Sequence, residues 1–165
     1  MTAPPPADTP PPTSPTVSGR PATSAFVAFR RRHHTPYHRY ARTRVEDRRA
    51  DTAVDDAFAE LAECWDEIMR SANPAGHAWR VLHAAVAAAD TGPPQAPETA
   101  RDTLHRTLPP DQADAVVLHY RLGMTLTTAA DLMGLEVPAV ALHLIMAERA
   151  LPAAAIRDLE RTPAP

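Results

Sequence analysis

The sequence contains no lysine and no long apolar run, and both absences narrow what the protein can be. All 17 basic residues among the 165 are arginine, and 20 acidic residues give a net charge of -3. The overall basic character of a strong nucleic-acid-binding protein is therefore missing, so any contact with nucleic acid needs a local basic patch.

Cysteine occurs once, as Cys64, which excludes an internal disulfide and a multi-cysteine metal site. A reducing compartment is therefore expected. The first residues, "MTAPPPADTPPP", lack the basic and apolar parts of a signal peptide, and no apolar run approaches the roughly 20 residues that span a bilayer. These features predict a cytoplasmic protein without membrane insertion.

Motifs that carry catalysis are also missing. The chain has no glycine-rich phosphate loop, no credible pair of catalytic carboxylates and no cysteine–histidine arrangement of known spacing. His33, His34 and His38 lie in one basic segment, but no cysteine or carboxylate nearby completes a ligand set. The sequence therefore predicts neither an enzyme, nor a cofactor, nor a metal site.

Proline divides the chain. Residues 1–24 hold eight of the 19 prolines and too little apolar surface to offset the entropy of ordering, which predicts a disordered tail. A second break, "DTGPPQAPE", predicts a linker over 91–107. No run of alternating β-branched residues occurs, so we expect an all-α protein with small helical domains at 25–90 and 108–152 and a tail at 153–165.

Three amphipathic helices are expected in the first domain. In the first helix, Phe26 and Phe29 share a face, and Pro36 is expected to break or restart the helix before Tyr37, Tyr40 and Ala41 continue the stripe. In the second, one buried face is formed by Val54, Phe58, Leu61, Trp65 and Ile68. An N-cap at Asn73 followed by Pro74 opens the third, which continues through Trp79, Leu82 and Val86.

Charge in this domain is segregated. Residues 30–49 contain eight arginines against Glu46 and Asp47, whereas residues 51–67 contain seven acids and no base. Two interpretations stay open: the segments are solvated helix faces that partly neutralise each other, or the acidic segment is a docking surface beside a basic one.

The second domain has the capping and turn residues of a helix-turn-helix. Asp111 follows a proline pair as a candidate N-cap, and Gly134 after a short helix, 127–133, permits the left-handed backbone of a tight turn. A further helix then starts at Glu136 and Val137, with one apolar face made by Val140, Leu144, Ala147 and Leu151. The same pattern would suit any short helical hairpin.

The order of these parts resembles a known family. "FVAFRRRHHTPYHRYARTRVEDRRADTAVDDAFAELAECWDEI" resembles the core-polymerase-binding domain of bacterial RNA polymerase sigma factors of the sigma-70 family, extracytoplasmic-function group. "LPPDQADAVVLHYRLGMTLTTAADLMGLEVPAVALHLIMAERAL" is similar to that group's C-terminal, promoter-binding domain. The resemblance implies a region 2-like three-helix bundle and a region 4-like helix-turn-helix.

The resemblance implies one intact surface and two altered ones. The family's acidic helix docks on a coiled coil of the largest polymerase subunit, and the matching residues here are Asp51, Val54, Asp55, Asp56 and Phe58. The helix that captures the unpaired promoter strand offers Arg80, His77 and His83 amid alanines. Where the family commonly has a threonine, a lysine and several arginines, the helix that reads the duplex has Ala139, Ala141, Leu142, His143, Met146 and Glu148. Only Arg149 matches that basic pattern.

These replacements predict weak contact with promoter DNA. Residues 111–151 contain two arginines against five acids, and alanine and leucine cannot make the hydrogen bonds that read bases. Instead, Leu142, Ile145 and Met146 form a second apolar stripe on the last helix. Either the first domain or the C-terminal segment covers this stripe, or it contacts a protein partner or a second copy of the chain.

The sequence thus favours a divergent sigma-like regulator of transcription initiation that docks on core RNA polymerase and touches promoter DNA weakly or indirectly. The alternative is a protein-interaction module that does not bind DNA, either a decoy for an anti-sigma factor or a dimeric scaffold. An enzyme is the least favoured class.

Overall fold

The computed structural model describes residues 23–91 and 103–161, and every regular element in these ranges is a helix. The first range holds α1 (Ser24–Arg44), α2 (Asp47–Glu63), α3 (Trp65–Arg70) and α4 (Pro74–Asp90). The second holds α5 (Thr103–Thr107), α6 (Pro110–Val116), the π-helical turn η1 (Val117–Arg121), α7 (Leu126–Met133), α8 (Val137–Ala150) and α9 (Ala153–Arg161). The expected all-α class is confirmed.

The predicted tail and linker fall largely outside the described residues, which exclude 1–22, 92–102 and 162–165. Within the described ranges, α5 occupies the end of the segment expected to be linker, and α9 occupies the expected C-terminal tail. The domain boundaries themselves stay a prediction.

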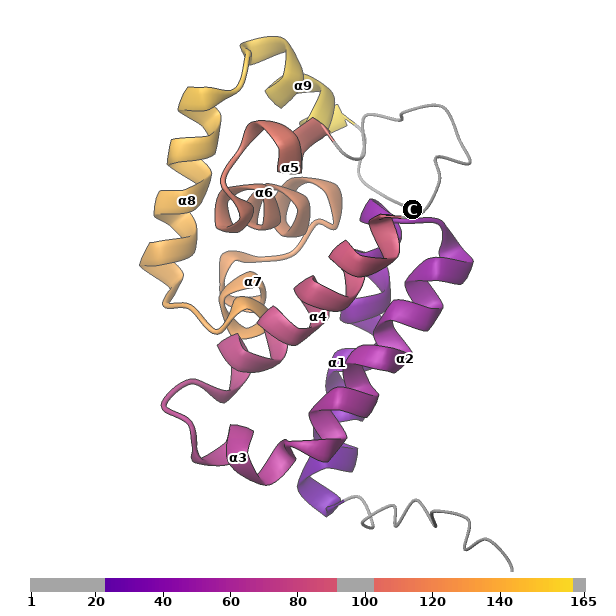
Figure 1. Cartoon of the computed structure of the whole chain (residues 1–165). Helices are drawn as coiled ribbons and strands as arrows, with labels where there is room; N and C mark the ends of the chain where they lie inside the picture. Colours follow the sequence, from indigo (N-terminus) through magenta and orange to yellow (C-terminus); the bar gives the residue numbers. More distant parts are fainter. Residues whose placement is uncertain (1–22, 92–102, 162–165) are drawn as a thin grey trace, which may run out of the picture.

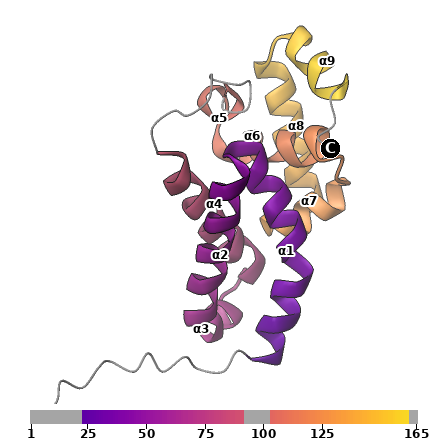
Figure 2. The ribbon, with the colours of Figure 1, turned by 90° about the vertical axis from the view of Figure 1, so that its right-hand side faces the viewer.

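The first four helices pack around an aromatic core. α2 lies between α1 and α4 in the packing, and Figures 1 and 2 show the three helices running alongside one another. The predicted face of α2 is confirmed, because all five of its residues are buried. The helix itself ends at Glu63, and a turn at Cys64 starts α3 in a new direction, so that Trp65 packs against Phe26 and Phe29 with ring centroids 5.2 and 4.9 Å apart.

The expected break at Pro36 is wrong, because α1 is continuous from Ser24 to Arg44 with the proline inside it. Proline lacks an N–H and disrupts a helix interior by about 3 kcal/mol. Tyr37, Tyr40 and Ala41, which follow Pro36, are fully buried in the same core as Phe26. Burial of aromatic side chains on both sides of the proline outweighs the local preference.

The start of α4 forms as predicted. The Asn73 side chain accepts a hydrogen bond from the Gly76 N–H at 2.9 Å, and Pro74 occupies the first helical turn. This arrangement satisfies one of the backbone donors left free at a helix N-terminus.

Asp111 is not the N-cap of the next long helix. α6 begins at Pro110 with Pro109 in the capping position, and Asp111 lies in the first turn. Proline suits the first helical position because its fixed φ is already helical and its missing N–H would have no partner there. An acid in the first turn still interacts favourably with the helix dipole.

The two groups of helices share one continuous core. Buried side chains from α1, α2 and α4 join those of α6, η1, α7 and α8 in a single cluster, with α4 packed against α7. In Figure 1, α4 lies between α1 and α2 on one side and α6 and α7 on the other, and α8 lies at the opposite edge of the molecule.

Among the described residues, no single helix is long and apolar enough to cross a membrane. Leu126–Met133 and Val137–Ala150 taken together pass the test of length and composition, but the pair is bent by 104°.

Two glycines with left-handed backbone allow a matched test of this packing. Gly123 has φ +63 and open space around it, whereas a Cβ on Gly134, with φ +64, would lie 2.0 Å from the backbone nitrogen of Gly76. Gly123→Ala should lower the free energy of unfolding by about 1–2 kcal/mol, the strain of a left-handed residue. Gly134→Ala should lower the free energy of unfolding by about 1–3 kcal/mol more than Gly123→Ala does, because its Cβ overpacks against α4.

Urea denaturation of the two variants measures this difference. Equal losses for both variants would show that the turn at Gly134 does not press against α4.

Candidate helix-turn-helix site and its buried anchor

The helix-turn-helix is built from α7, the turn at Gly134 and α8. The Thr125 hydroxyl caps α7 by accepting the Thr128 N–H at 3.1 Å, and Gly134 ends the helix in the left-handed region with φ 64 and ψ 38. Glu136 precedes α8, which has Pro138 in its first turn. The predicted turn glycine is confirmed, and α7 begins one residue earlier than expected.

The turn is held against the first group of helices. The Asn73 side-chain amide donates a hydrogen bond to the Gly134 carbonyl at 2.7 Å, while its oxygen caps α4. Arg32 on α1 forms an ion pair with Asp131 on α7 at 3.5 Å. Because Asn73 serves both the cap and the turn, the start of α4 and the helix-turn-helix have a fixed relation.

α8 has one buried apolar face and one exposed apolar face. Val140, Leu144 and Ala147 are buried, which confirms the predicted inner face. The second stripe faces outward, with exposed fractions of 57% for Leu142 and 45% each for Ile145 and Met146. The first helices do not cover it, and α9 packs on η1 instead. Within the described residues, the interpretation in which the chain buries its own stripe is therefore wrong.

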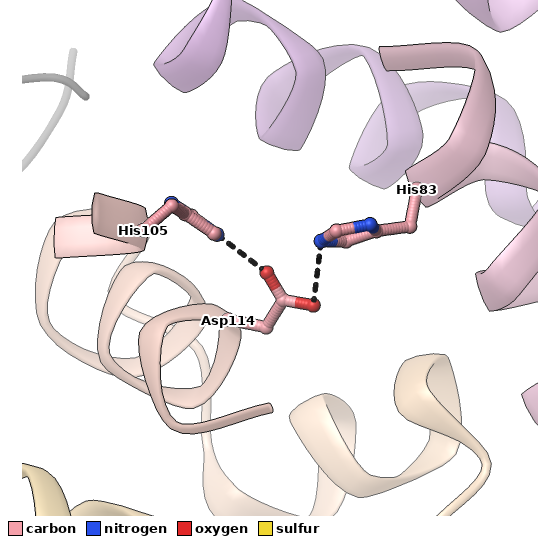
Figure 3. Close-up of side chains that lie close together, drawn as sticks. All are labelled: His83, His105 and Asp114. Carbon is pink, nitrogen blue, oxygen red and sulfur yellow. Dashed lines mark hydrogen bonds and ion pairs between the residues drawn. The ribbon is translucent and has the colours of Figure 1, made fainter. Parts of the chain in front are cut away.

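The buried carboxylate of Asp114 anchors the two groups of helices to each other, and we call it the anchor. Asp114 on α6 is 1% exposed, and three side chains donate to it or face it at hydrogen-bonding distance: the Tyr40 hydroxyl at 2.5 Å, the Trp79 indole N–H at 3.1 Å and His105 Nε2 at 2.8 Å. His83 Nε2 lies 3.7 Å from the other side of the carboxylate (Figure 3). Asp114 thus connects α1, α4, α5 and α6.

The electrostatics favour an ionised Asp114. Burial by itself raises the pKa of Asp114, but the hydrogen bonds from His105 and Tyr40 and the nearby His83 outweigh it, so the pKa lies below its ordinary value. The ionised carboxylate therefore adds stability above the ordinary pKa, and this contribution is lost as the pH falls through the folded-state pKa. Burial raises the pKa of Tyr40 and lowers that of His83.

Residues 102–151 match the family model for sigma-70, region 4. This segment is therefore similar to sigma-70 region 4, and we refer to it as the region 4 domain. No curated protein and no solved structure matches the chain. The match covers α5 to α8, including the helix-turn-helix, so the expected resemblance of this part is confirmed. Similarity to sigma-70 region 4 indicates sigma-factor-like regulation of transcription.

The residues predicted to contact DNA lie on two helices, α8 and α4. Leu142 and Arg149 are exposed on the last helix of the region 4 domain, and the three other positions predicted there are half-buried: Ala139, Ala141 and His143. Arg80 is exposed on α4, where its Nε donates to the Gly76 carbonyl, and His83 turns inward towards Asp114. The region 4 domain has three acids against Arg149 between residues 126 and 150.

The acidic helix α2 presents two kinds of residue. Val54 and Phe58 are 0% and 2% exposed and belong to the core, so a partner could meet only the acids around them. Asp55 pairs with Arg30 at 3.5 Å, and Asp51 pairs with Arg42 at 3.1 Å. The hydrogen bond from Arg42 lowers the pKa of Asp51. The arginines of α1 thus neutralise one edge of α2.

The opposite edge of α2 carries unneutralised charge. Asp56, Glu60 and Glu63 are exposed, and among the described residues none of the three forms an ion pair. Their spacing of four and three places them on one helix face. Partial neutralisation therefore holds for the edge of α2 beside α1, and the docking surface stays a prediction.

Sequence reasoning missed the anchor at Asp114. It counted Asp114 with the surface acids of the region 4 domain and treated His83 as a candidate DNA contact. One signal was present, because the aspartate stands inside the apolar run "ADAVVL". An acidic residue surrounded by apolar residues in its helix is expected to be buried together with them, and a buried carboxylate needs hydrogen-bond donors.

Replacing the anchor gives a direct test of its role. Asp114→Ala leaves the Tyr40 hydroxyl and the Trp79 N–H buried without an acceptor, so the free energy of unfolding should fall by about 3–5 kcal/mol. Asp111→Ala, in the exposed first turn of the same helix, should change it by only about 0.5 kcal/mol. Denaturation in urea measures both, and similar losses in the two variants would contradict the assignment of Asp114 as the anchor.

Proposed function

We propose that this protein is a divergent sigma-like regulator of transcription initiation, related to the extracytoplasmic-function group, that works in the cytoplasm on core RNA polymerase. The similarity of residues 102–151 to sigma-70 region 4 supports a role in transcription regulation. The finer proposal is that α2 makes the polymerase contact and that the region 4 domain contacts promoter DNA weakly or indirectly.

The exposed acids of α2 support the polymerase contact. Asp56, Glu60 and Glu63 form a ridge of like charge, which attracts a basic partner and repels nucleic acid. Val54 and Phe58 hold the ridge in place from inside the core, and Asp51 and Asp55 flank it beside the arginines of α1. The ridge fits the basic coiled coil that the resemblance to sigma factors implies as partner.

The outer face of α8 supports the weak contact with DNA. Most DNA affinity comes from basic side chains that neutralise phosphates, and α8 offers Arg149 alone. Leu142 and Met146, on the exposed face, cannot make the bidentate hydrogen bonds that discriminate base pairs by about 1–3 kcal/mol. A second subunit would then have to supply promoter selection.

Charge reversal on the ridge tests the polymerase contact. Asp56→Arg combined with Glu60→Arg should abolish capture of purified core RNA polymerase, because like charges facing each other at an interface cost several kcal/mol. Helical content and melting temperature should stay close to those of the wild type, since both side chains are exposed.

The matched control changes the net charge equally at a distance from α2. Glu136→Arg combined with Asp158→Arg alters two exposed acids of the second group of helices and should leave capture intact. Wild-type protein that does not bind core polymerase would refute the sigma-like function. If the ridge variant binds as well as the control, the polymerase contact lies on a surface other than α2.

A second function is favoured by the exposed stripe Leu142, Ile145 and Met146. Spacing of three and four residues is that of a helix–helix seam, and a seam without charge suits a symmetric pair of identical helices. The alternative to the sigma-like function is therefore a dimeric scaffold that does not bind DNA. A decoy for an anti-sigma factor would use the same stripe.

Introducing charge into the stripe tests this alternative. If the scaffold function holds, the wild-type protein sediments as a dimer, and Leu142→Glu combined with Met146→Glu is monomeric with unchanged helical content, because both side chains are exposed. Sedimentation velocity at several protein concentrations measures the change. A monomeric wild type would exclude the dimeric scaffold and leave the decoy as the form of the alternative.

A further inference from the structure

Two histidines and an aspartate from three different helices meet inside the protein. His83 of α4, His105 of α5 and Asp114 of α6 each offer one ligand atom, and these atoms lie within 4.8 Å of one another. Figure 3 shows both imidazole rings pointing at the carboxylate from opposite sides. We propose that these three residues form a zinc site that ties the region 4 domain to α4.

The distances suit a single small cation. Zinc bonds of about 2.0–2.1 Å in tetrahedral geometry place neighbouring ligand atoms about 3.3 Å apart. The separation is 2.8 Å from His105 Nε2 to Asp114 Oδ1 and 3.7 Å from His83 Nε2 to Asp114 Oδ2. The two distances run to different carboxylate oxygens, and the three ligand atoms lie within 4.8 Å of one another, so the side chains would have to draw together around a bound ion.

An unpartnered nitrogen points to a ligand between these groups. Within the described residues, His83 Nε2 is buried and has no hydrogen-bond partner, and it is too far from the Asp114 carboxylate to bond with it directly. A buried polar atom aimed at a carboxylate without reaching it is costly unless something satisfies both. A divalent cation coordinated by His83 Nε2 and the carboxylate does so.

The donor set selects the ion class. Imidazole nitrogen suits zinc and other late transition metals, whereas magnesium and calcium prefer sites made of oxygen ligands alone. Three protein ligands leave the fourth tetrahedral position to water.

Hydrogen bonds from neighbouring side chains orient the Asp114 carboxylate, as is usual for a metal ligand. The Tyr40 hydroxyl and the Trp79 indole N–H donate to its two oxygens and fix the plane of the carboxylate. Partners of this kind orient metal ligands, and their loss typically weakens metal binding about 10–100-fold.

The proposal does not depend on polymerase docking. Zinc at this position would join α4 of the first group of helices to α5 and α6 of the region 4 domain. Because the unfolded chain cannot offer the preformed set, zinc would stabilise the folded state and raise its melting temperature with concentration.

Zinc binding to the full chain tests the proposal. After treatment with a chelator, wild-type protein should bind one zinc ion per chain in equilibrium dialysis and melt at a higher temperature with zinc than without it. His83→Gln and His105→Gln should each weaken binding at least tenfold, whereas His77→Gln, a half-buried histidine of the same helix as His83, should bind like the wild type.

Circular dichroism without zinc establishes that each variant is folded. X-ray absorption of zinc-loaded wild type counts imidazole ligands without any substitution, and two are expected. The proposal is overturned if wild-type protein binds no zinc, if folded His83→Gln binds it as tightly as wild type, or if the absorption spectrum shows a number of imidazoles other than two.

Discussion

The fold depends on one buried carboxylate. Asp114 accepts from Tyr40 of α1 and Trp79 of α4 and lies 2.8 Å from His105 Nε2 of α5, so that side chains separated by as many as 74 residues meet at one point. A buried charge is tolerated only when several donors satisfy it, and these donors can satisfy it only when both groups of helices are in place. Together with the Asn73 contact to Gly134, the anchor holds the helix-turn-helix in a fixed position on α4.

This fixed position decides which surfaces remain for partners. The inner face of α8 is buried in the core, and its outer face exposes Leu142, Ile145 and Met146. On the other side of the molecule, α2 exposes carboxylates that its own arginines do not neutralise. Protein contact through either surface is compatible with the same packing.

Local features of the fold could be predicted from the sequence, and long-range ones could not. The buried stripe of α2, the Asn73 cap and the Gly134 turn follow from periodicity and backbone preference, which act within a few residues. Pro36 was expected to break α1 because local preference ignores the burial of Tyr37 and Tyr40 on the shared core. The contacts of Asp114 join residues 35 and 74 positions apart, and no pattern in a single sequence reports such pairs.

Hydrogen exchange on the full chain tests the central claim, that this protein meets polymerase through α2 and has little use for DNA at α8. The account predicts that core RNA polymerase slows exchange of the backbone amides over residues 55–63, and that promoter-length duplex DNA alone leaves exchange over residues 137–150 unchanged at physiological salt. Slowed exchange over α8 with duplex DNA, together with unchanged exchange over α2 with polymerase, would contradict it.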